Sequence, residues 1–162
     1  MTISTGDKLP DATLLKLGAD GPEQVRLSDI TSDRKVVIFG LPGAYTGVCT
    51  NAHVPSFINN RDKLMENGVQ EIVCVSVNDP FVMQAWGDST GASEAGITML
   101  GDASAEFTKA IGMAFTAPPA GFYDRSRRYA MLIENNEVKI LNTEDNPGMC
   151  DASAAETMLD QM

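Results

Sequence analysis

The sequence predicts an α/β fold in which a mixed central sheet is flanked by helices. Two observations lead to this prediction. Short apolar, β-branched runs alternate with stretches of helical spacing through much of the chain, which is the βαβ rhythm of a parallel sheet. Two later runs flank a short polar turn and predict an antiparallel hairpin. Because 162 residues can bury a core of their own, residues 1–162 are expected to form a single domain.

The parallel part contains three predicted strands, each followed by a helical pattern. The strands are the apolar runs 35–41, 71–77 and 98–100. The helical patterns reach about residue 67, begin at Asp79-Pro80, and cover 103–111. Proline suits the first turn of a helix, and Asp79 and Asp102 are residues that accept hydrogen bonds at helix starts. These patterns therefore predict three crossover helices.

The later part of the chain predicts a hairpin and a terminal helix. Residues 117–121, rich in proline and glycine, predict a loop. Asn135-Asn136, between the runs 128–133 and 138–141, suits a type I′ turn, and Ser153 with Glu156 has the spacing of a capping box. Parallel βαβ units followed by a hairpin and a C-terminal helix are the element order of a thioredoxin-like α/β sandwich.

Charge and hydropathy exclude several classes of partner. Twelve basic and 22 acidic side chains give a formal net charge of −10, which argues against nucleic acid and anionic membranes because both would be repelled. The sequence contains no apolar stretch long enough to span a bilayer, and its first residues lack the basic and apolar regions of a signal peptide. The expectation is a cytoplasmic protein.

Three cysteines stand at irregular spacings, at positions 49, 74 and 150. Such an odd, irregular set argues against a disulfide framework and favours a reducing compartment. Paired metal ligands are absent as well, so no metal site is expected.

Cys49 is the candidate for chemistry because a buried strand is expected to turn into a helix there. The free backbone N–H groups and the dipole of a first helical turn favour an anion, and so favour a thiolate. Pro42 and Gly47 allow a tight backbone around the cysteine, and the Thr46 hydroxyl can turn towards the sulfur or a bound oxygen. The plainer alternatives are a small buried cysteine and an ordinary loop hydrogen bond from Thr46.

These residues resemble a known family. Pro42, Thr46 and Cys49 reproduce the Pro-x-x-x-Thr-x-x-Cys motif of peroxiredoxins, and the strings 53–57, 74–81 and 128–131 resemble the type-five (plant type II-like) subfamily. The resemblance implies a thiol peroxidase in which Cys49 attacks hydrogen peroxide or a small alkyl hydroperoxide and becomes a sulfenic acid. It also implies that Arg128 and Thr46 stabilise the leaving oxygen, that Pro42 shields the sulfur, and that no metal, haem or flavin takes part.

The sulfenic acid must be reduced, and three routes are open. Cys74 has a spacing from Cys49 that resembles plant members, but it lies in an apolar strand where a buried inert thiol is equally expected. Cys150 follows the expected loop 146–149 and resembles the resolving cysteine of animal members, with a surface bystander as the alternative. The third route is an external thiol, supplied by a glutaredoxin/glutathione or thioredoxin system. Resemblance further implies a homodimer that buries Tyr45 and Phe81.

Other interpretations are weaker. His53, four residues after Cys49, could form a protease-like Cys/His pair, but by resemblance it is a packing histidine. A disulfide oxidoreductase is disfavoured because the chain contains no Cys-x-x-Cys pair. A redox sensor or adaptor, in which oxidation of Cys49 switches a binding surface, stays open as the alternative function. Arg125 and Arg127 do not match the motif and are expected to be surface charge, although one of them could support the site.

Overall fold

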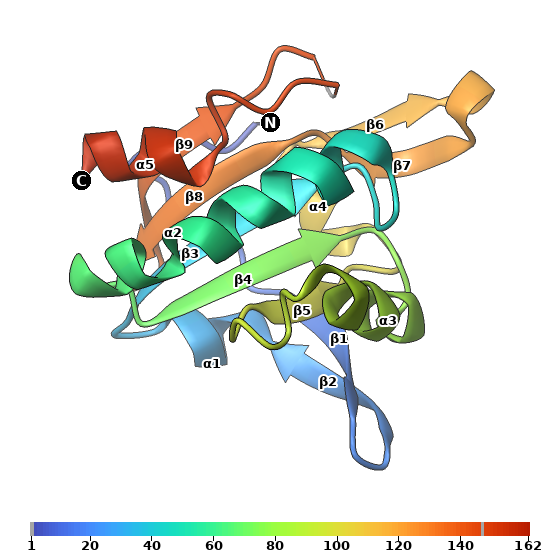
Figure 1. The fold of residues 1–162 in the computed structure, drawn as a ribbon, viewed down its shortest axis with the longest axis horizontal. Coiled ribbons are helices and arrows are strands. Elements are labelled where there is room, and N and C mark those ends of the chain that lie inside the picture. The colour runs from blue at the N-terminus through green and yellow to red at the C-terminus, as the bar shows by residue number, and fades with distance from the viewer. Residues whose placement is uncertain (1, 147) are drawn as a thin grey trace.

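The computed structural model describes residues 2–146 and 148–162, and within them a seven-stranded sheet is the framework (Figure 1). Its strand order is β2-β1-β5-β4-β3-β8-β9. These strands are β1 Thr13–Gly18, β2 Gly21–Arg26, β3 Lys35–Leu41, β4 Glu71–Ser76, β5 Thr98–Gly101, β8 Tyr129–Glu134 and β9 Glu137–Thr143. A separate two-stranded sheet joins β6 Ala114–Ala117 to β7 Phe122–Ser126.

The central sheet is mixed, as predicted. Strands β3, β4 and β5 run parallel, whereas β8 pairs antiparallel with β3 and with β9. Asn135 and Asn136 have φ values of 46° and 66°, which confirms the predicted type I′ turn between β8 and β9. The sheet therefore places the start of β8 beside the end of β3.

Helices cover both faces of the sheet, so the strands in its centre are apolar throughout. On one face lie α2 (Val54–Glu66), α3 (Pro80–Thr90) and α5 (Ala155–Gln161), and α2 runs across the sheet with α5 beside it (Figure 1). On the other face, α1 (Leu27–Thr31) and α4 (Glu106–Ala110) pack with the N-terminal residues. In β3, Val37 and Phe39 enter the first core, whereas Val36 and Ile38 enter the second.

Helix starts are confirmed in part. The Asp79 carboxylate accepts the Val82 N–H, and the Asp102 carboxylate accepts the N–H groups of Phe107 and Thr108, although α4 begins at residue 106 instead of 103. The predicted capping box of the last helix is wrong. Ser153 donates its hydroxyl to Glu144 and does not cap α5.

Two hairpins have no counterpart in the sequence-based prediction. The β1–β2 ribbon lies at the sheet edge, and most of β2 is exposed, so it lacks an apolar alternation. The predicted loop 117–121 connects β6 to β7 and contains a short 3-10 turn, Pro118–Ala120. In Figure 1 this second hairpin projects away from the main sheet.

Gly40 in β3 is a point where the fold tolerates no side chain. A Cβ at this position would overlap the Tyr129 ring, which is fully buried on the paired strand. We expect Gly40→Ala to lower the free energy of unfolding by about 1–3 kcal/mol, because the ring has no room to move. Urea denaturation measures this change. Gly47→Ala is the matched control, since no heavy atom lies within 4 Å of its added methyl, and an equal loss there would contradict the steric explanation.

Candidate active site

The sheet brings Cys49 and Arg128 together from distant parts of the chain. Cys49 follows β3 after a short loop, and Arg128 immediately precedes β8, whose first residue Tyr129 pairs with Gly40 near the end of β3. The Arg128 guanidinium donates from Nη2 to the Cys49 sulfur at 3.1 Å. Both side chains are buried, and a guanidinium held against sulfur favours the thiolate over the thiol.

Cys49 lies in the first turn of the helical segment, as predicted, but the chain becomes helical at Gly47, where the Thr50 N–H bonds to the Thr46 carbonyl in the α pattern. Residues Cys49–His53 form a π-helix in which the Val54 N–H bonds to the Cys49 carbonyl, five residues earlier. The chain then continues as α2. A π turn is wider than an α turn, so His53 does not lie over Cys49 as a four-residue spacing in an α-helix would place it.

The loop before Cys49 is held by its own hydrogen bonds. The Thr46 hydroxyl donates to the Gly43 carbonyl at 2.7 Å, so its proton is not directed at the sulfur. This bond leaves the hydroxyl oxygen of Thr46 able to accept a hydrogen bond from a ligand. The Asn78 side chain accepts the Ala44 N–H, which ties the loop to the segment after β4.

Arg125 and Arg127 have different surroundings. Arg125 donates from Nη1 to the Pro42 carbonyl at 3.0 Å and lies 5.4 Å above the Phe122 ring, so it supports the loop that carries the motif. Arg127 is exposed and points into a different cavity. Arg127 is therefore surface charge, as expected, and Arg125 is the arginine of the pair that supports the site.

A cavity of about 280 Å³ lies over the motif. Its lining consists of Pro42, Thr46, Gly47, Val48, Phe122, Arg128 and Gly148. Cys49 does not line this cavity and is 0% exposed. Arg128, whose guanidinium contacts the Cys49 sulfur, is one of the lining residues. A small molecule that enters this cavity therefore meets Thr46 and Arg128 first, and reaches the sulfur only when the adjacent wall moves.

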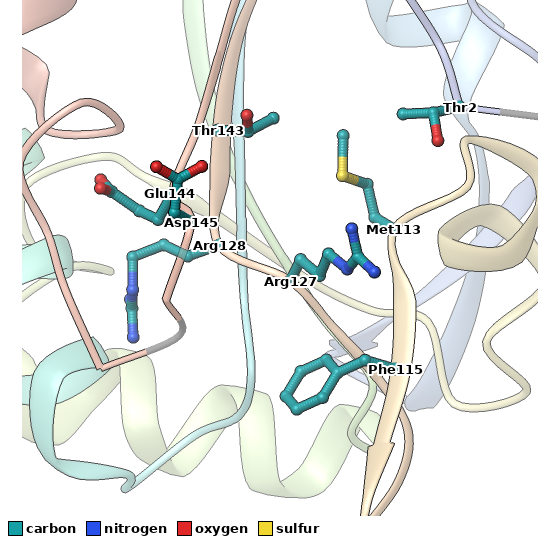
Figure 2. A pocket seen from close by; sticks show the side chains of 8 residues that line it. All are labelled: Thr2, Met113, Phe115, Arg127, Arg128, Thr143, Glu144 and Asp145. Carbon is teal, nitrogen blue, oxygen red and sulfur yellow. The ribbon is translucent and has the colours of Figure 1, made fainter.

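A second cavity, of about 420 Å³, lies on the other side of the Arg127-Arg128 backbone. Thr2, Met113, Phe115, Thr143, Glu144 and Asp145 line it together with these two arginines. Figure 2 shows the neighbouring arginines pointing in opposite directions, with Arg127 towards Met113. The carboxylates of Glu144 and Asp145 make this cavity a poor match for an anionic ligand.

His53 is buried, as expected of a packing histidine, but both ring nitrogens have polar partners. Nδ1 lies 3.0 Å from Nη1 of Arg128, and Nε2 lies 3.1 Å from the Ser153 carbonyl oxygen. Burial, together with the positive charge of Arg128, lowers the pKa of His53 to about 3. A neutral ring with both nitrogens engaged cannot serve as the base for Cys49, so a protease-like pair is excluded.

The other two cysteines differ in accessibility. Cys74 lies fully buried in β4, with Phe39 and Met99 as its neighbours on the paired strands. Burial raises its pKa well above the ordinary value, and the negative charge of Cys49 raises it further. Cys150 is partly exposed; burial raises its pKa too, against the lowering effect of Arg128.

The prediction of an exposed loop at 146–149 includes residue 147, which lies outside the described residues.

The segment that carries Cys150 is organised by Glu144. Its Oε2 atom accepts the Asp151 N–H at 2.9 Å, the Ser153 N–H at 2.6 Å, and the Ser153 hydroxyl. Burial opposes ionisation of Glu144, but the hydrogen bonds from Ser153 and Asp151 outweigh it and lower its pKa below the ordinary value. The ionised carboxylate thus stabilises the folded form of this segment.

In the ranges 2–146 and 148–162, no three His, Cys, Asp or Glu side chains are grouped so that they could hold a metal ion. Over the same ranges, no helix has the length and hydropathy needed to cross a bilayer.

An α/β sandwich that holds a buried cysteine against a guanidinium, at the start of a helix and beneath a small cavity, is the arrangement of a thiol-based redox enzyme. The Redoxin family matches residues 4–159. Peroxiredoxin-2E-2 of Oryza sativa subsp. japonica, a chloroplastic protein, is 46% identical, over 98% of this chain and 72% of its own length.

Solved structures agree with this assignment. Reduced Prx3 of Vibrio vulnificus in complex with H2O2 is similar with a TM-score of 0.90 and 43% identity, over 99% of both chains. Peroxiredoxin 5 of Alvinella pompejana is similar with a TM-score of 0.83 and 32% identity, also over 99% of both chains. The chain belongs to the peroxiredoxin family, has the thioredoxin-like fold, and is a thiol-dependent peroxidase.

The Glu144 contacts generate a prediction about the segment 150–154. We expect Glu144→Gln to raise the rate of Cys150 alkylation several-fold, because a neutral amide accepts the three hydrogen bonds less strongly. Because the folded pKa of Glu144 is lowered, its contribution to stability is complete above the unfolded pKa and is lost as the pH falls through the folded value.

Peptide mass spectrometry after timed alkylation measures the Cys150 rate, and denaturation at several pH values measures the stability difference. That difference between wild type and Glu144→Gln should shrink as the medium becomes acidic. A difference that stays constant down to acid pH would show that the charge of Glu144 does not hold the segment. Glu137→Gln is the control, since its carboxylate pairs with exposed Lys139 far along the chain from Cys150.

Proposed function

We propose that Cys49 is the residue that reacts with the hydroperoxide. The observation that carries this proposal is the 3.1 Å contact between Arg128 Nη2 and the Cys49 sulfur. The thiolate attacks one peroxide oxygen, a sulfur–oxygen bond forms, and the O–O bond breaks. The other oxygen takes up a proton and leaves as water or alcohol, and Cys49 becomes a sulfenic acid. The Arg128 guanidinium stabilises the negative charge that develops on the leaving oxygen.

Thr46 and Pro42 have supporting roles in this proposal. The Thr46 hydroxyl donates to the Gly43 carbonyl, so its oxygen is oriented to accept a hydrogen bond from a hydroperoxide in the cavity that Thr46 lines. Pro42 forms part of the same wall and limits access of water to the sulfur. Arg125, bound to the Pro42 carbonyl, keeps this wall in place. The cavity volume of about 280 Å³ suits hydrogen peroxide and small alkyl hydroperoxides.

The subfamily, the reductant and the location belong to the same proposal. Similarity to a plant peroxiredoxin-2E-2 and to a peroxiredoxin 5 supports the type-five (plant type II-like) subfamily. We propose glutaredoxin/glutathione or thioredoxin as reductant and a single catalytic domain over residues 1–162. A cytoplasmic location stays a prediction, since the relatives include chloroplastic and mitochondrial proteins.

We propose a homodimer because two aromatic side chains near the motif loop are exposed. Tyr45 is 57% exposed and Phe81 is 59% exposed, although both are large and apolar. Tyr45 belongs to the motif loop, which the Asn78 side chain joins to the segment that leads into α3 and Phe81. Burying both in a contact between two copies would remove apolar surface beside the active site from water.

For the resolving thiol we propose Cys150 in preference to Cys74. A thiolate must attack the sulfenic acid, and full burial disfavours the thiolate of Cys74. Cys74 also lies in a strand that is paired on both sides, so it cannot move without breaking the sheet. Cys150 is partly exposed, lies in irregular chain, and senses the charge of Arg128.

Removal of the reactive sulfur tests the assignment of Cys49. We expect Cys49→Ser to abolish peroxide consumption with either thioredoxin or glutathione plus glutaredoxin, because no thiolate then faces the guanidinium. Stopped-flow measurement of peroxide consumption gives the rate. Cys74→Ser is the control and should retain turnover. If wild type were no faster than Cys49→Ser with both reductants, the sensor interpretation would replace the enzyme interpretation.

A separate measurement identifies the resolving thiol. We expect peroxide-treated wild type to contain a disulfide between Cys49 and Cys150, and Cys150→Ser to accumulate the sulfenic acid of Cys49. Trapping with a sulfenic-acid reagent followed by peptide mass spectrometry distinguishes the two states. A disulfide to Cys74, or wild type that accumulates sulfenic acid as Cys150→Ser does, would overturn the choice of Cys150, and the latter result would indicate an external thiol.

A further inference from the structure

We propose that His53 is a positioning residue that holds the Arg128 guanidinium against Cys49 and ties it to the chain segment carrying Cys150. The proposal rests on the roles proposed above for Cys49 and Arg128. It extends them to a residue that the peroxidase motif does not include.

Two nitrogens of the guanidinium contact Cys49 and His53. Nη2 donates to the Cys49 sulfur at 3.1 Å, and Nη1 lies 3.0 Å from Nδ1 of His53. Because the guanidinium is planar, fixing Nη1 on the imidazole also fixes the direction in which Nη2 points. The acceptor on His53 therefore contributes to the alignment of the donor on Cys49.

The partners of His53 determine its tautomer. A guanidinium can only donate, so Nδ1 must carry the lone pair. A carbonyl oxygen can only accept, so Nε2 must carry the proton that it donates to the Ser153 carbonyl. Only the neutral ring with its proton on Nε2 makes both hydrogen bonds at once. The low pKa of His53, about 3, keeps that form at any physiological pH.

Packing prevents the ring from turning away from these partners. His53 is fully buried, and its ring centroid lies 5.0 Å from that of Phe39 and 5.6 Å from that of Phe57. The two phenylalanines stack on each other at 4.2 Å and form a rigid wall. A histidine that served packing alone would not need partners at both nitrogens, and an apolar side chain would serve that purpose without the cost of burying polar atoms.

The second hydrogen bond of His53 reaches the segment 150–154. Its acceptor is the carbonyl of Ser153, whose N–H and hydroxyl are both held by Glu144. Cys150 lies three residues before this anchor. A continuous set of hydrogen bonds therefore runs from Cys49 through Arg128 and His53 to the segment that carries the proposed resolving thiol. Any displacement of Arg128 would therefore disturb the contact that restrains this segment as well.

Two substitutions separate the two hydrogen bonds. The amide of asparagine reaches the position of Nδ1, so His53→Asn retains an acceptor for Arg128 but loses the donor to Ser153. The longer glutamine reaches the position of Nε2, so His53→Gln retains the donor to Ser153 but loses the acceptor for Arg128. Phe57→Leu is the matched control, because it loosens the packing around the ring and leaves both hydrogen bonds possible.

We expect His53→Gln to lower the rate constant of Cys49 oxidation by hydrogen peroxide about tenfold, since small displacements of a catalytic donor are costly. His53→Asn should recover most of that rate. The opposite order is expected for Cys150, whose alkylation should be several-fold faster in His53→Asn than in wild type and little changed in His53→Gln. Single-turnover oxidation and timed alkylation with mass spectrometry measure the two rates, and thermal denaturation confirms that each variant is folded at the assay temperature.

Equal effects of the two His53 variants on both rates, or a loss in Phe57→Leu as large as that in His53→Gln, would overturn the proposal and leave His53 a packing residue. The thiolate absorbance of Cys49, measured without peroxide, should be weaker at neutral pH in His53→Gln than in wild type. This readout tests the position of Arg128 independently of turnover. If wild type did not consume peroxide, the proposed function would fail while the absorbance still decided the role of His53.

Discussion

A buried guanidinium in contact with a cysteine sulfur is the interaction on which the active site depends. Transfer of a positive charge into the protein interior is unfavourable unless an anion and hydrogen-bond acceptors replace water. Arg128 is 1% exposed and lies against Cys49 and His53. The cost of burying the cation therefore favours the anionic form of the sulfur. The antiparallel pairing of β3 with β8 provides this contact, because it joins the strand before Cys49 to the strand after Arg128.

Burial of the sulfur creates a second constraint, because both the peroxide and the reductant must reach it. Cys49 is 0% exposed, and the cavity above it is lined by the motif loop and by the β7 residue Phe122. The neighbouring helix contains a π turn at Cys49–His53, near its start, and such a turn is less stable than an α turn and commonly occurs at functional sites. Local opening of this turn would expose the sulfenic acid without disturbing the sheet.

The sequence was sufficient to predict five strands of the central sheet, β3, β4, β5, β8 and β9, but not the β1–β2 ribbon at its edge nor the contacts that position Cys49. Strands β3, β4 and β8 are buried on both faces and so have a strong apolar pattern, whereas the exposed ribbon of β2 has none. The capping box at Ser153 failed because Glu144, nine residues earlier, binds its hydroxyl. Local spacing holds no information on such tertiary partners. The same reason explains why the sequence did not indicate which of Arg125 and Arg127 supports the site, because the Pro42 carbonyl that Arg125 binds is 83 residues away.

His53 shows most clearly what sequence spacing leaves out. Its position four residues after Cys49 suggests a Cys/His pair, yet the π turn and the partners at both ring nitrogens direct it to Arg128 and Ser153. A histidine that acted as a base here would become an imidazolium. Its positive charge would repel the Arg128 guanidinium and compete with it for the thiolate. A neutral imidazole instead accepts from the guanidinium and leaves the positive charge where the peroxide oxygen develops negative charge. The arrangement therefore uses histidine for its hydrogen-bond geometry and not for its titration.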